Sequence, residues 1–293
     1  MHYFTIEGDS ALPVWPLMNH SYGPFEISQT NTECCFELNI SEDQPTDDEK
    51  VLVYSNQNDV EEGFIAISIF KKRDNGLCLE LRHPFSSEVN AYLKISDDFA
   101  KAVLTLCGSI EEQWHTFNAA VNLCYILATI KHHTLLLHSS AVMHQGKAYL
   151  FLGKSGTGKS THSRMWLSAI DGVTLINDDH PVVRVLESGD VVAYGSPWSG
   201  KTPCYKNVCA PLGGIVRIVR APHNKAIRLS PVQSYASIMT SCGGMTWDKA
   251  YADERDVTIQ RIIRSIPCWN MECRPDEDAA LVCAKAVLDV QGN

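Results

Sequence analysis

The sequence lacks long apolar runs. No stretch approaches about 18 uninterrupted apolar residues, the minimum that a membrane-spanning helix needs. The first residues, MHYFTIEGDSALPVW, also lack a basic region followed by an apolar one, which a secretory signal peptide would have. We therefore expect a cytoplasmic protein with no membrane partner.

Basic residues are outnumbered by acidic ones. The chain has 25 Lys and Arg residues against 34 Asp and Glu residues, a formal net charge of -9, and an acidic cluster, SEDQPTDDEK, at 41–50. A surface of this sign does not attract nucleic acid or anionic lipid, so neither is an expected partner. With 293 residues, of which 45% are hydrophobic, the chain can bury a core of ordinary size in one large or two modest domains.

The eleven cysteines do not have the spacing of a structural zinc site. Cys204 and Cys209 are separated by four residues, as are Cys268 and Cys273, whereas such sites commonly use a tighter gap. We do not predict zinc. An odd number of cysteines without a secretory signal favours reduced thiols in the core. The cysteines with several apolar neighbours are Cys78, Cys107, Cys124 and Cys283.

Residues 1–108 are predicted to form a β-rich N-terminal domain of unknown role. The segments GFIAISIF (63–70) and LCLELRH (77–83) alternate large apolar residues with others, and Asn75-Gly76 between them suits the tight turn of a hairpin. No catalytic constellation is evident in this part, which favours a structural or partner-facing module. Further strands of an antiparallel sheet are predicted at 51–54 and 91–95.

Residues 109–293 mix helical and strand patterns, which indicates a second domain with an α/β core. Residues 111–133 carry an apolar stripe at helical spacing, and the strand AYLFL leads into a glycine-rich segment and a helix from Lys159 to Ile170. The other predicted elements are a strand VTLIND, a hairpin PVVRVLESGDVVAYG, a strand pair in 214–229, helices starting near Pro231 and Trp247, a strand CWNMEC and a helix from about Pro275.

The glycine-rich segment fits the P-loop signature G-x-x-x-x-G-K-[ST]. Glycines let the backbone turn with positive φ and bring its N–H groups against phosphate oxygens, and the N-terminus of the following helix adds its free N–H groups. Lys159 would reach the β and γ oxygens of a nucleotide, and the Ser160 hydroxyl would ligate Mg²⁺. The predicted nucleotide-binding residues are Gly153, Lys154, Ser155, Gly156, Thr157, Gly158, Lys159, Ser160 and Thr161.

Two adjacent carboxylates follow the apolar run VTLIN. Asp178 and Asp179 stand 20 residues beyond the lysine of the glycine loop, at the end of a strand that we expect to lie beside it. Adjacent side chains on extended backbone point to opposite sides, so the two carboxylates should have different tasks. One can hold Mg²⁺ and the other can accept a proton from an attacking hydroxyl.

These segments together resemble the HPr kinase/phosphorylase family, whose kinase domain is similar to the nucleotide-binding domain of ATP-dependent phosphoenolpyruvate carboxykinase. The resemblance implies a P-loop core of mixed sheet with helices, covers roughly residues 110–290, and leaves the first hundred residues outside it. It is carried, in chain order, by LLLHSSAV, GKSGTGKST, LINDDHPVVRV, GSPWSGK, PLGGIVRI and IPCWNMECRPDEDAALV.

The resemblance also implies roles for single residues. By position, Lys159 binds phosphates, Ser160 and Asp179 serve Mg²⁺, and Asp178 is the base toward a serine hydroxyl. His138 would lie close to that carboxylate and orient or polarise it, whereas the residues alone favour a packed histidine at a strand end. Relatives form ring-like assemblies, which makes a homo-oligomer a possible partner.

The chain departs from the family in one segment. Enzymes that phosphorylate HPr carry a segment L-E-I-R-G-L-G after the aspartate pair, whereas this chain has YGSPWSGKTPCYKNVCAPLGG and looks more like relatives that phosphorylate free serine or a peptide. In that segment Lys201, with Arg217 or Arg220, could neutralise a transferring phosphate. The alternative is a surface loop with Trp198 inserted into the core.

Three functions fit this pattern. The first is an ATP- and Mg²⁺-dependent kinase acting on a hydroxyl, most simply that of a serine in a small molecule, peptide or protein. The second is a regulatory or scaffold protein that senses nucleotide without transferring phosphate. The third is a carboxykinase-like enzyme acting on a small carboxylic acid. The acceptor, the use of ADP or pyrophosphate, and phosphorolysis are open at this point.

Overall fold

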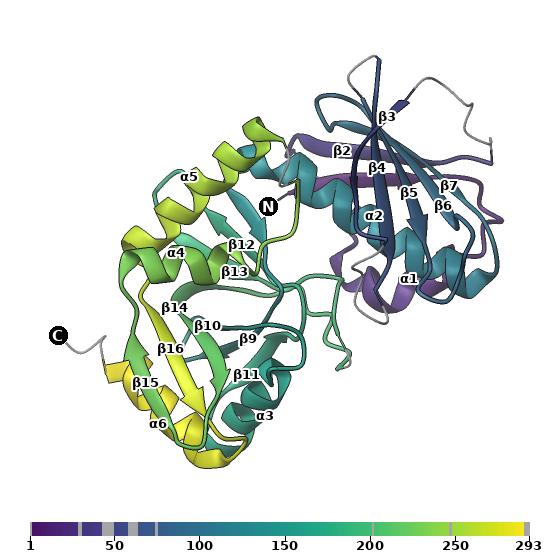
Figure 1. Ribbon diagram of the computed structural model, residues 1–293. Coiled ribbons are helices and arrows are strands. Elements are labelled where there is room, and N and C mark those ends of the chain that lie inside the picture. Colours follow the sequence, from purple (N-terminus) through teal and green to yellow (C-terminus); the bar gives the residue numbers. More distant parts are fainter. Residues whose placement is uncertain are drawn as a thin grey trace. The chain divides into compact units, whose positions relative to one another are not determined.

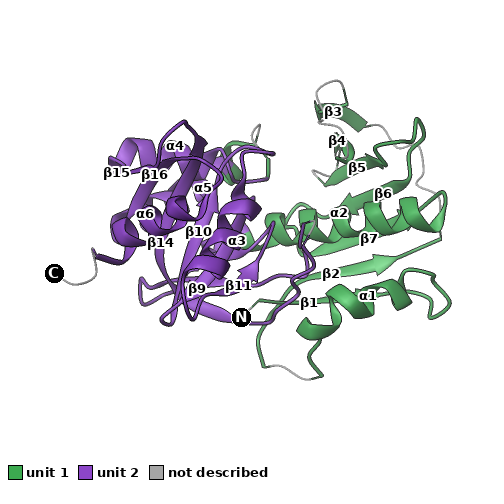
Figure 2. Cartoon of the chain, turned by 90° about the horizontal axis from the view of Figure 1, so that it is seen from below, with its two compact units in different colours: residues 1–129, 244–251 green, residues 130–243, 252–293 purple. Residues whose placement is uncertain are grey.

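The structure is a computed structural model that describes residues 2–28, 31–42, 50–57, 64–73, 76–200, 202–245 and 248–289. In these residues the chain is a mixed α/β protein with two mixed sheets and six α-helices (Figure 1). It divides into two compact units, each described here by itself (Figure 2). Unit 1 comprises residues 1–129 and 244–251, and unit 2 comprises residues 130–243 and 252–293.

Unit 1 is built on a seven-stranded sheet in the order β1-β2-β7-β6-β5-β4-β3. The strands are β1 (Tyr3–Glu7), β2 (Cys34–Ile40), β3 (Lys50–Ser55), β4 (Ala66–Lys72), β5 (Leu77–Arg82), β6 (Ala91–Ile95) and β7 (Lys101–Leu106). Strands β4 and β5 form the predicted hairpin, while its expected turn residue Asn75 lies outside the described residues. The pairs from β3 to β7 are antiparallel, as expected.

The sheet as a whole is mixed, which the sequence did not predict. Strand β1 pairs with β2, and β2 with β7, in parallel. Parallel neighbours are joined by long crossovers and not by tight turns, so no local turn signal marks them. The crossover from β1 to β2 contains α1 (Trp15–Ser21) and a 3-10 turn, η1 (Gly23–Phe25).

Helix α2 (Ile110–Thr129) packs within unit 1. It contacts β2, β5, β6 and β7, and Phe117, Val121 and Cys124 are fully buried at the predicted helical spacing. The predicted boundary between residues 108 and 109 therefore falls at the beginning of a helix that belongs to unit 1. The assignment of 1–108 and 109–293 as separate domains stays a prediction.

Unit 2 contains a nine-stranded sheet with the main order β11-β9-β10-β14-β13-β12-β8. Strand β16 pairs with β14, and β15 pairs with β16. The strands are β8 (Thr134–Leu136), β9 (Ser139–His144), β10 (Lys147–Leu152), β11 (Thr174–Asn177), β12 (Val182–Val185), β13 (Val191–Tyr194), β14 (Cys209–Arg220), β15 (Lys225–Arg228) and β16 (Cys268–Cys273). The helices of unit 2 are η2 (Ile130–His132), α3 (Lys159–Ala169), α4 (Pro231–Met239), α6 (Glu277–Leu288) and α5 (Lys249–Ser265) from residue 252 onward.

Two strand neighbourhoods of unit 2 differ from the expectation. Strand β11, which precedes the two aspartates, does not pair with β10, because β9 lies between them and is antiparallel to both. Strands β14 and β15 do not form a pair either, since β16 lies between them. The inner position is taken in the first case by β9, which directly precedes β10, and in the second case by β16, which comes from later in the chain.

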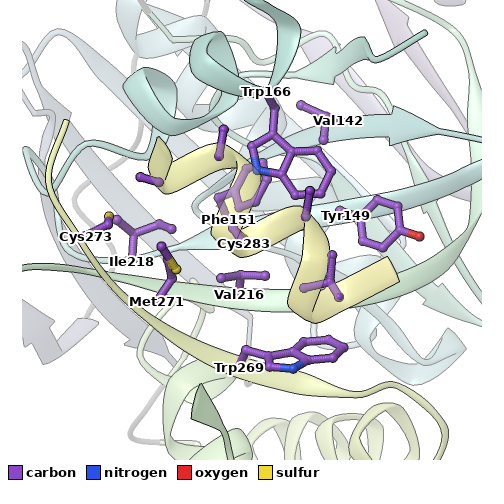
Figure 3. Packing of buried hydrophobic residues seen from close by; sticks show 14 residues of the cluster. Val142, Tyr149, Phe151, Trp166, Val216, Ile218, Trp269, Met271, Cys273 and Cys283 are labelled. Carbon is purple, nitrogen blue, oxygen red and sulfur yellow. The ribbon is translucent and has the colours of Figure 1, made fainter. Parts of the chain in front are cut away.

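One hydrophobic cluster fixes the glycine loop at its place in unit 2. Trp166 of α3 packs with Tyr149 and Phe151 of β10 and with Val216 of β14, under residues of α6 (Figure 3). Residues two apart on a strand point to the same face, which is why the alternating side chains of β10 can meet one helix. Because β10 and α3 are both held in this cluster, the short loop between them begins and ends at fixed points.

The cysteines are reduced and mostly lie in the interior, as the sequence predicts. All eleven cysteines are free thiols, and Cys78, Cys124 and Cys283 are buried as predicted, while Cys107 is half-buried. Burial raises the pKa of Cys124 to about 12, so this thiol stays protonated. In the described part of the chain, every helix is too short or too polar to cross a bilayer.

Candidate functional site

The glycine-rich loop follows the end of β10 directly and runs into α3. Its glycines have positive φ angles, 72° at Gly156 and 109° at Gly158, and Gly158 is the N-cap of α3. A Cβ atom at Gly156 would meet no atom within 4 Å, so this side of the loop is open. The conformation is one that glycine adopts without steric cost, and it leaves the free N–H groups at the start of α3 accessible.

Lys159 lies at the centre of this loop. Its side chain is largely buried, and Nζ donates hydrogen bonds to the carbonyl oxygens of Gly153 at 3.1 Å and Lys154 at 3.4 Å. Thr157 closes the loop by donating from its hydroxyl to the carbonyl of Lys154 at 2.8 Å. The ammonium group is therefore held against the loop by backbone carbonyl groups.

Arg220 at the end of β14 supports the same loop from outside. Its Nε donates to the carbonyl of Thr157 at 3.4 Å, and its terminal nitrogen donates to the carbonyl of Gly156. Sequence analysis considered Arg220 and Arg217 as phosphate ligands. Arg217 is exposed on β14, and Lys201 lies outside the described residues.

Asp178 is tied to α3 through Ser140 of β9. The Ser140 hydroxyl donates to Oδ1 of Asp178 at 2.9 Å and lies 2.5 Å from the hydroxyl of Ser163, in the second turn of α3. All three side chains are buried. Oδ2 of Asp178 is also buried and has no hydrogen-bond partner among the residues that the structure describes. A carboxylate oxygen in this condition is an acceptor available to a proton or a cation.

Asn177 holds the backbone on which the aspartates stand. Its Oδ1 accepts hydrogen bonds from the N–H groups of Asp179 at 2.9 Å and His180 at 2.8 Å. Its amide nitrogen donates to Ser196 and to the carbonyl of Trp198, at 3.0 Å for the latter. The loop that contains Trp198 is thereby fixed to the end of β11, and Trp198 is buried, as the loop alternative expected.

Asp179 faces two histidines and not Ser140. Nδ1 of His180 lies 3.0 Å from its Oδ2, and Nε2 of His138 lies 4.0 Å from its Oδ1. The carboxylate that His138 contacts is therefore that of Asp179, whereas the resemblance led us to expect Asp178. These three side chains offer ligand atoms within 4.8 Å of one another and could hold a metal ion.

Charge in this group follows from burial and from Lys159. Burial and the positive charge of Lys159 lower the pKa of His138 to about 4, against the opposing effect of Asp179. His138 is thus neutral at pH 7, and its contact with Asp179 is not an ion pair. Burial raises the pKa of Asp179, but the hydrogen bond and charge of His180, with the charge of Lys159, outweigh this and lower it. Asp179 is a carboxylate at neutral pH.

Of the predicted residues, those of the glycine loop lie together, and the positive charge of Lys159 lowers the pKa of both His138 and Asp179. Ser155 is exposed, and Ser160 and Thr161 are half-buried in the first turn of α3. Sequence reasoning missed four polar residues of this site, although three of them stand within the quoted motifs LLLHSSAV and LINDDHPVVRV. They are Ser140, Ser163, Asn177 and His180.

Comparisons with known proteins yield only distant structural similarity. No protein-family model matches the chain, and no curated protein matches it. Among solved structures, the chain is similar to the HPr(Ser) kinase/phosphatase from Coxiella burnetii, with 12% sequence identity and a TM-score of 0.31. The similarity covers 53% of this chain and 95% of that chain. The two structures are distant, so a function has to be inferred from the chain's own residues.

Proposed function

We propose that the protein is a kinase that uses ATP and Mg²⁺ to transfer the γ-phosphate to a hydroxyl group, that of a serine in a small molecule, a peptide or a protein. The observation that carries this proposal is the contact of Ser140 with both Asp178 and Ser163. Through it, a buried carboxylate is fixed to the helix whose N-terminus forms the glycine loop. A phosphate-binding loop and a proton acceptor at fixed positions are the two parts that phosphoryl transfer to a hydroxyl requires.

The loop suits a nucleotide on chemical grounds. Gly156 and Gly158 have positive φ angles, which suit a loop whose N–H groups bind an anion, and the N-terminus of α3 favours negative charge. Lys159 adds a cation that donates to the carbonyls of Gly153 and Lys154, and phosphate oxygens would be stronger acceptors than these neutral groups.

The two aspartates suit different tasks. One oxygen of Asp178 is engaged by Ser140 and the other has no partner among the described residues, so the second can take the proton of an attacking hydroxyl. Asp179 is ionised and half-exposed, and with Ser160 it would hold Mg²⁺. Mg²⁺ bound there would neutralise charge on the phosphoryl group during transfer.

The test is a titration of the full-length protein with ATP and ADP in the presence of Mg²⁺, followed by incubation with γ-labelled ATP and free serine, or with a lysate of the source cells. We expect label on serine or on one discrete protein band. The variant Asp178→Asn should bind ATP as tightly as the parent and lose transfer. Asp171→Asn, an exposed aspartate after α3, is the matched control and should keep both.

Each other result has a defined meaning. Full turnover in Asp178→Asn would exclude Asp178 as the base. Tight ATP binding with no label on any acceptor would favour the nucleotide-sensing alternative, and ATP consumption that depends on oxaloacetate would favour a carboxykinase-like enzyme. No binding of ATP or ADP would remove the nucleotide proposal altogether.

A further inference from the structure

A second group of potential metal ligands lies in unit 1, outside the site described above. His83 directly follows β5, and Glu111 and His115 stand in the first turns of α2. Each side chain offers one ligand atom, and these atoms all lie within 4.8 Å of one another. The two imidazole rings meet edge to face, with centroids 4.9 Å apart. Segments that are 28 residues apart in the chain thus bring two histidines and a carboxylate together.

The backbone of His83 is held in place by its own turn. Its N–H donates to Oδ1 of Asn90 at 2.8 Å, and the N–H of Asn90 donates to the carbonyl of Leu81 at 2.8 Å. The carbonyl of Asn90 accepts from the N–H of Cys107 at 2.7 Å. His83 and Asn90 are both buried. The turn after β5 is therefore closed by hydrogen bonds that do not involve the His83 ring, so the backbone position from which His83 would act as a ligand is preorganised.

Glu111 differs from its neighbour Glu112. Oε2 of Glu112 accepts hydrogen bonds from both the N–H and the hydroxyl of Ser109, at 2.8 Å each, and so caps α2. Glu111 has no hydrogen bond or ion pair to any residue in the described part of the chain. Glu111 and His115 are four residues apart on the helix, a spacing that places them on one face. The cap is made by Glu112, and Glu111 is left to face the histidines.

The group has an alternative arrangement without a metal. The N–H of Phe85 points to Nδ1 of His83 at 3.4 Å, which would assign a proton to the other ring nitrogen of a neutral His83. This contact is long for a hydrogen bond and weak. If a metal ion bound to a ring nitrogen of His83, the protein would lose at most the contact from Phe85. The metal ion would be bound by three side chains, His83, Glu111 and His115.

We propose that His83, Glu111 and His115 form a binding site for Zn²⁺, with a further coordination position open to water. Two imidazole nitrogens and one carboxylate are ligands that Zn²⁺ accepts, whereas Mg²⁺ prefers oxygen ligands alone. Bound Zn²⁺ links the end of β5 to the beginning of α2 and stabilises unit 1. The site is independent of the proposed kinase function, and it was missed in the sequence because only cysteine pairs were considered there.

The experiment uses full-length protein treated with a chelator and then titrated with Co²⁺ in excess Mg²⁺ without nucleotide. We expect a bound Co²⁺ that is lost in His115→Ala, with visible absorption bands of low coordination number and no thiolate charge-transfer band. Zn²⁺ should displace the Co²⁺ and raise the melting temperature. His115→Ala and Glu111→Gln lie on the exposed side of α2 and should fold, and each should weaken Zn²⁺ binding by more than about 100-fold.

Two control variants separate this site from others. Glu88→Gln changes an exposed glutamate near His83 and should leave the Co²⁺ spectrum unchanged. His138→Ala removes one ligand of the group around Asp179, which has the same ligand types, and should retain the Co²⁺ that His115→Ala loses. A thiolate band would assign the metal to cysteines and overturn the proposal. Loss of Co²⁺ in His138→Ala with retention in His115→Ala would overturn it as well, as would the absence of any Co²⁺ or Zn²⁺ binding.

Discussion

The hydroxyl of Ser140 donates a hydrogen bond to the buried carboxylate of Asp178 at 2.9 Å. Since the one hydroxyl proton of Ser140 is used in this bond, the 2.5 Å contact with Ser163 has Ser163 as the donor. The result is a chain of hydrogen bonds in which Ser163 of α3 donates to Ser140 of β9, and Ser140 donates to Asp178 at the end of β11. It fixes which oxygen of Asp178 is engaged, and it leaves Oδ2 as the acceptor.

We predict from this chain that Ser140→Ala impairs transfer and not nucleotide binding. The loss of a hydrogen bond to a charged group costs about 1.5–3 kcal/mol, so kcat should fall about 10-fold or more. Binding of ATP, measured by calorimetry, should be unchanged because Ser140 does not belong to the glycine loop. Ser163→Ala leaves the bond from Ser140 to Asp178 intact and is expected to lower kcat less. An equal kcat in the parent and Ser140→Ala would contradict the positioning role.

The second prediction concerns the two lysines of the glycine loop. Lys159 is largely buried and bonded to loop carbonyls, whereas the side chain of Lys154 is exposed. Lys159→Ala should weaken ATP binding about 10-fold to 100-fold, because a charge-assisted bond to phosphate is lost. Lys154→Ala keeps the backbone that Lys154 contributes to the loop and removes only an exposed side chain, so this matched control should bind nearly as the parent does. Calorimetric titration measures both, and equal affinities for the two variants would remove Lys159 from the nucleotide site.

The third prediction concerns the loop that Asn177 fixes to β11. Gly195 donates its N–H to the carbonyl of Val208 at 2.9 Å, and a Cβ atom at this position would collide with the carbonyl oxygen of Lys206. Gly195→Ala should therefore lower the free energy of unfolding by about 1–3 kcal/mol, as overpacking does. Gly23→Ala, where a Cβ atom would meet open space, is the control and should be close to neutral. Urea denaturation measures both values, and a neutral Gly195→Ala would show that the backbone there can move apart.

What the sequence could predict was local, and what it missed was long-range. The glycine loop between β10 and α3 was predicted because the pattern that encodes it is contiguous. The position of β9 between β10 and β11 was not predicted, because the order of strands in a sheet is set by contacts between segments that are distant in the sequence. Ser140 was not proposed for a related reason. Its role depends on Asp178, 38 residues away, and no spacing rule connects the two.

The last prediction is a pH dependence that originates at His162. This residue in α3 is almost fully buried, and its Nε2 accepts a hydrogen bond from the indole of Trp166 at 3.2 Å. Burial lowers the pKa of His162 from 6.5 to about 4. Between these values the unfolded chain binds a proton that the folded protein does not bind. The free energy of unfolding should therefore fall as the pH drops from about 6.5 toward 4, by up to about 3 kcal/mol from His162.

The measurement compares urea denaturation at pH 7 and pH 4.5 for the parent, His162→Gln and His223→Gln. Carboxylates titrate in the same range, so the informative quantity is how far each substitution reduces the stability loss between the two pH values. His162→Gln should remove about 2–3 kcal/mol of that loss, because the buried group no longer has to stay unprotonated. His223 is exposed beside Glu272, and its substitution should remove little. If both variants lose stability on acidification as the parent does, His162 is accessible to protons in the folded state.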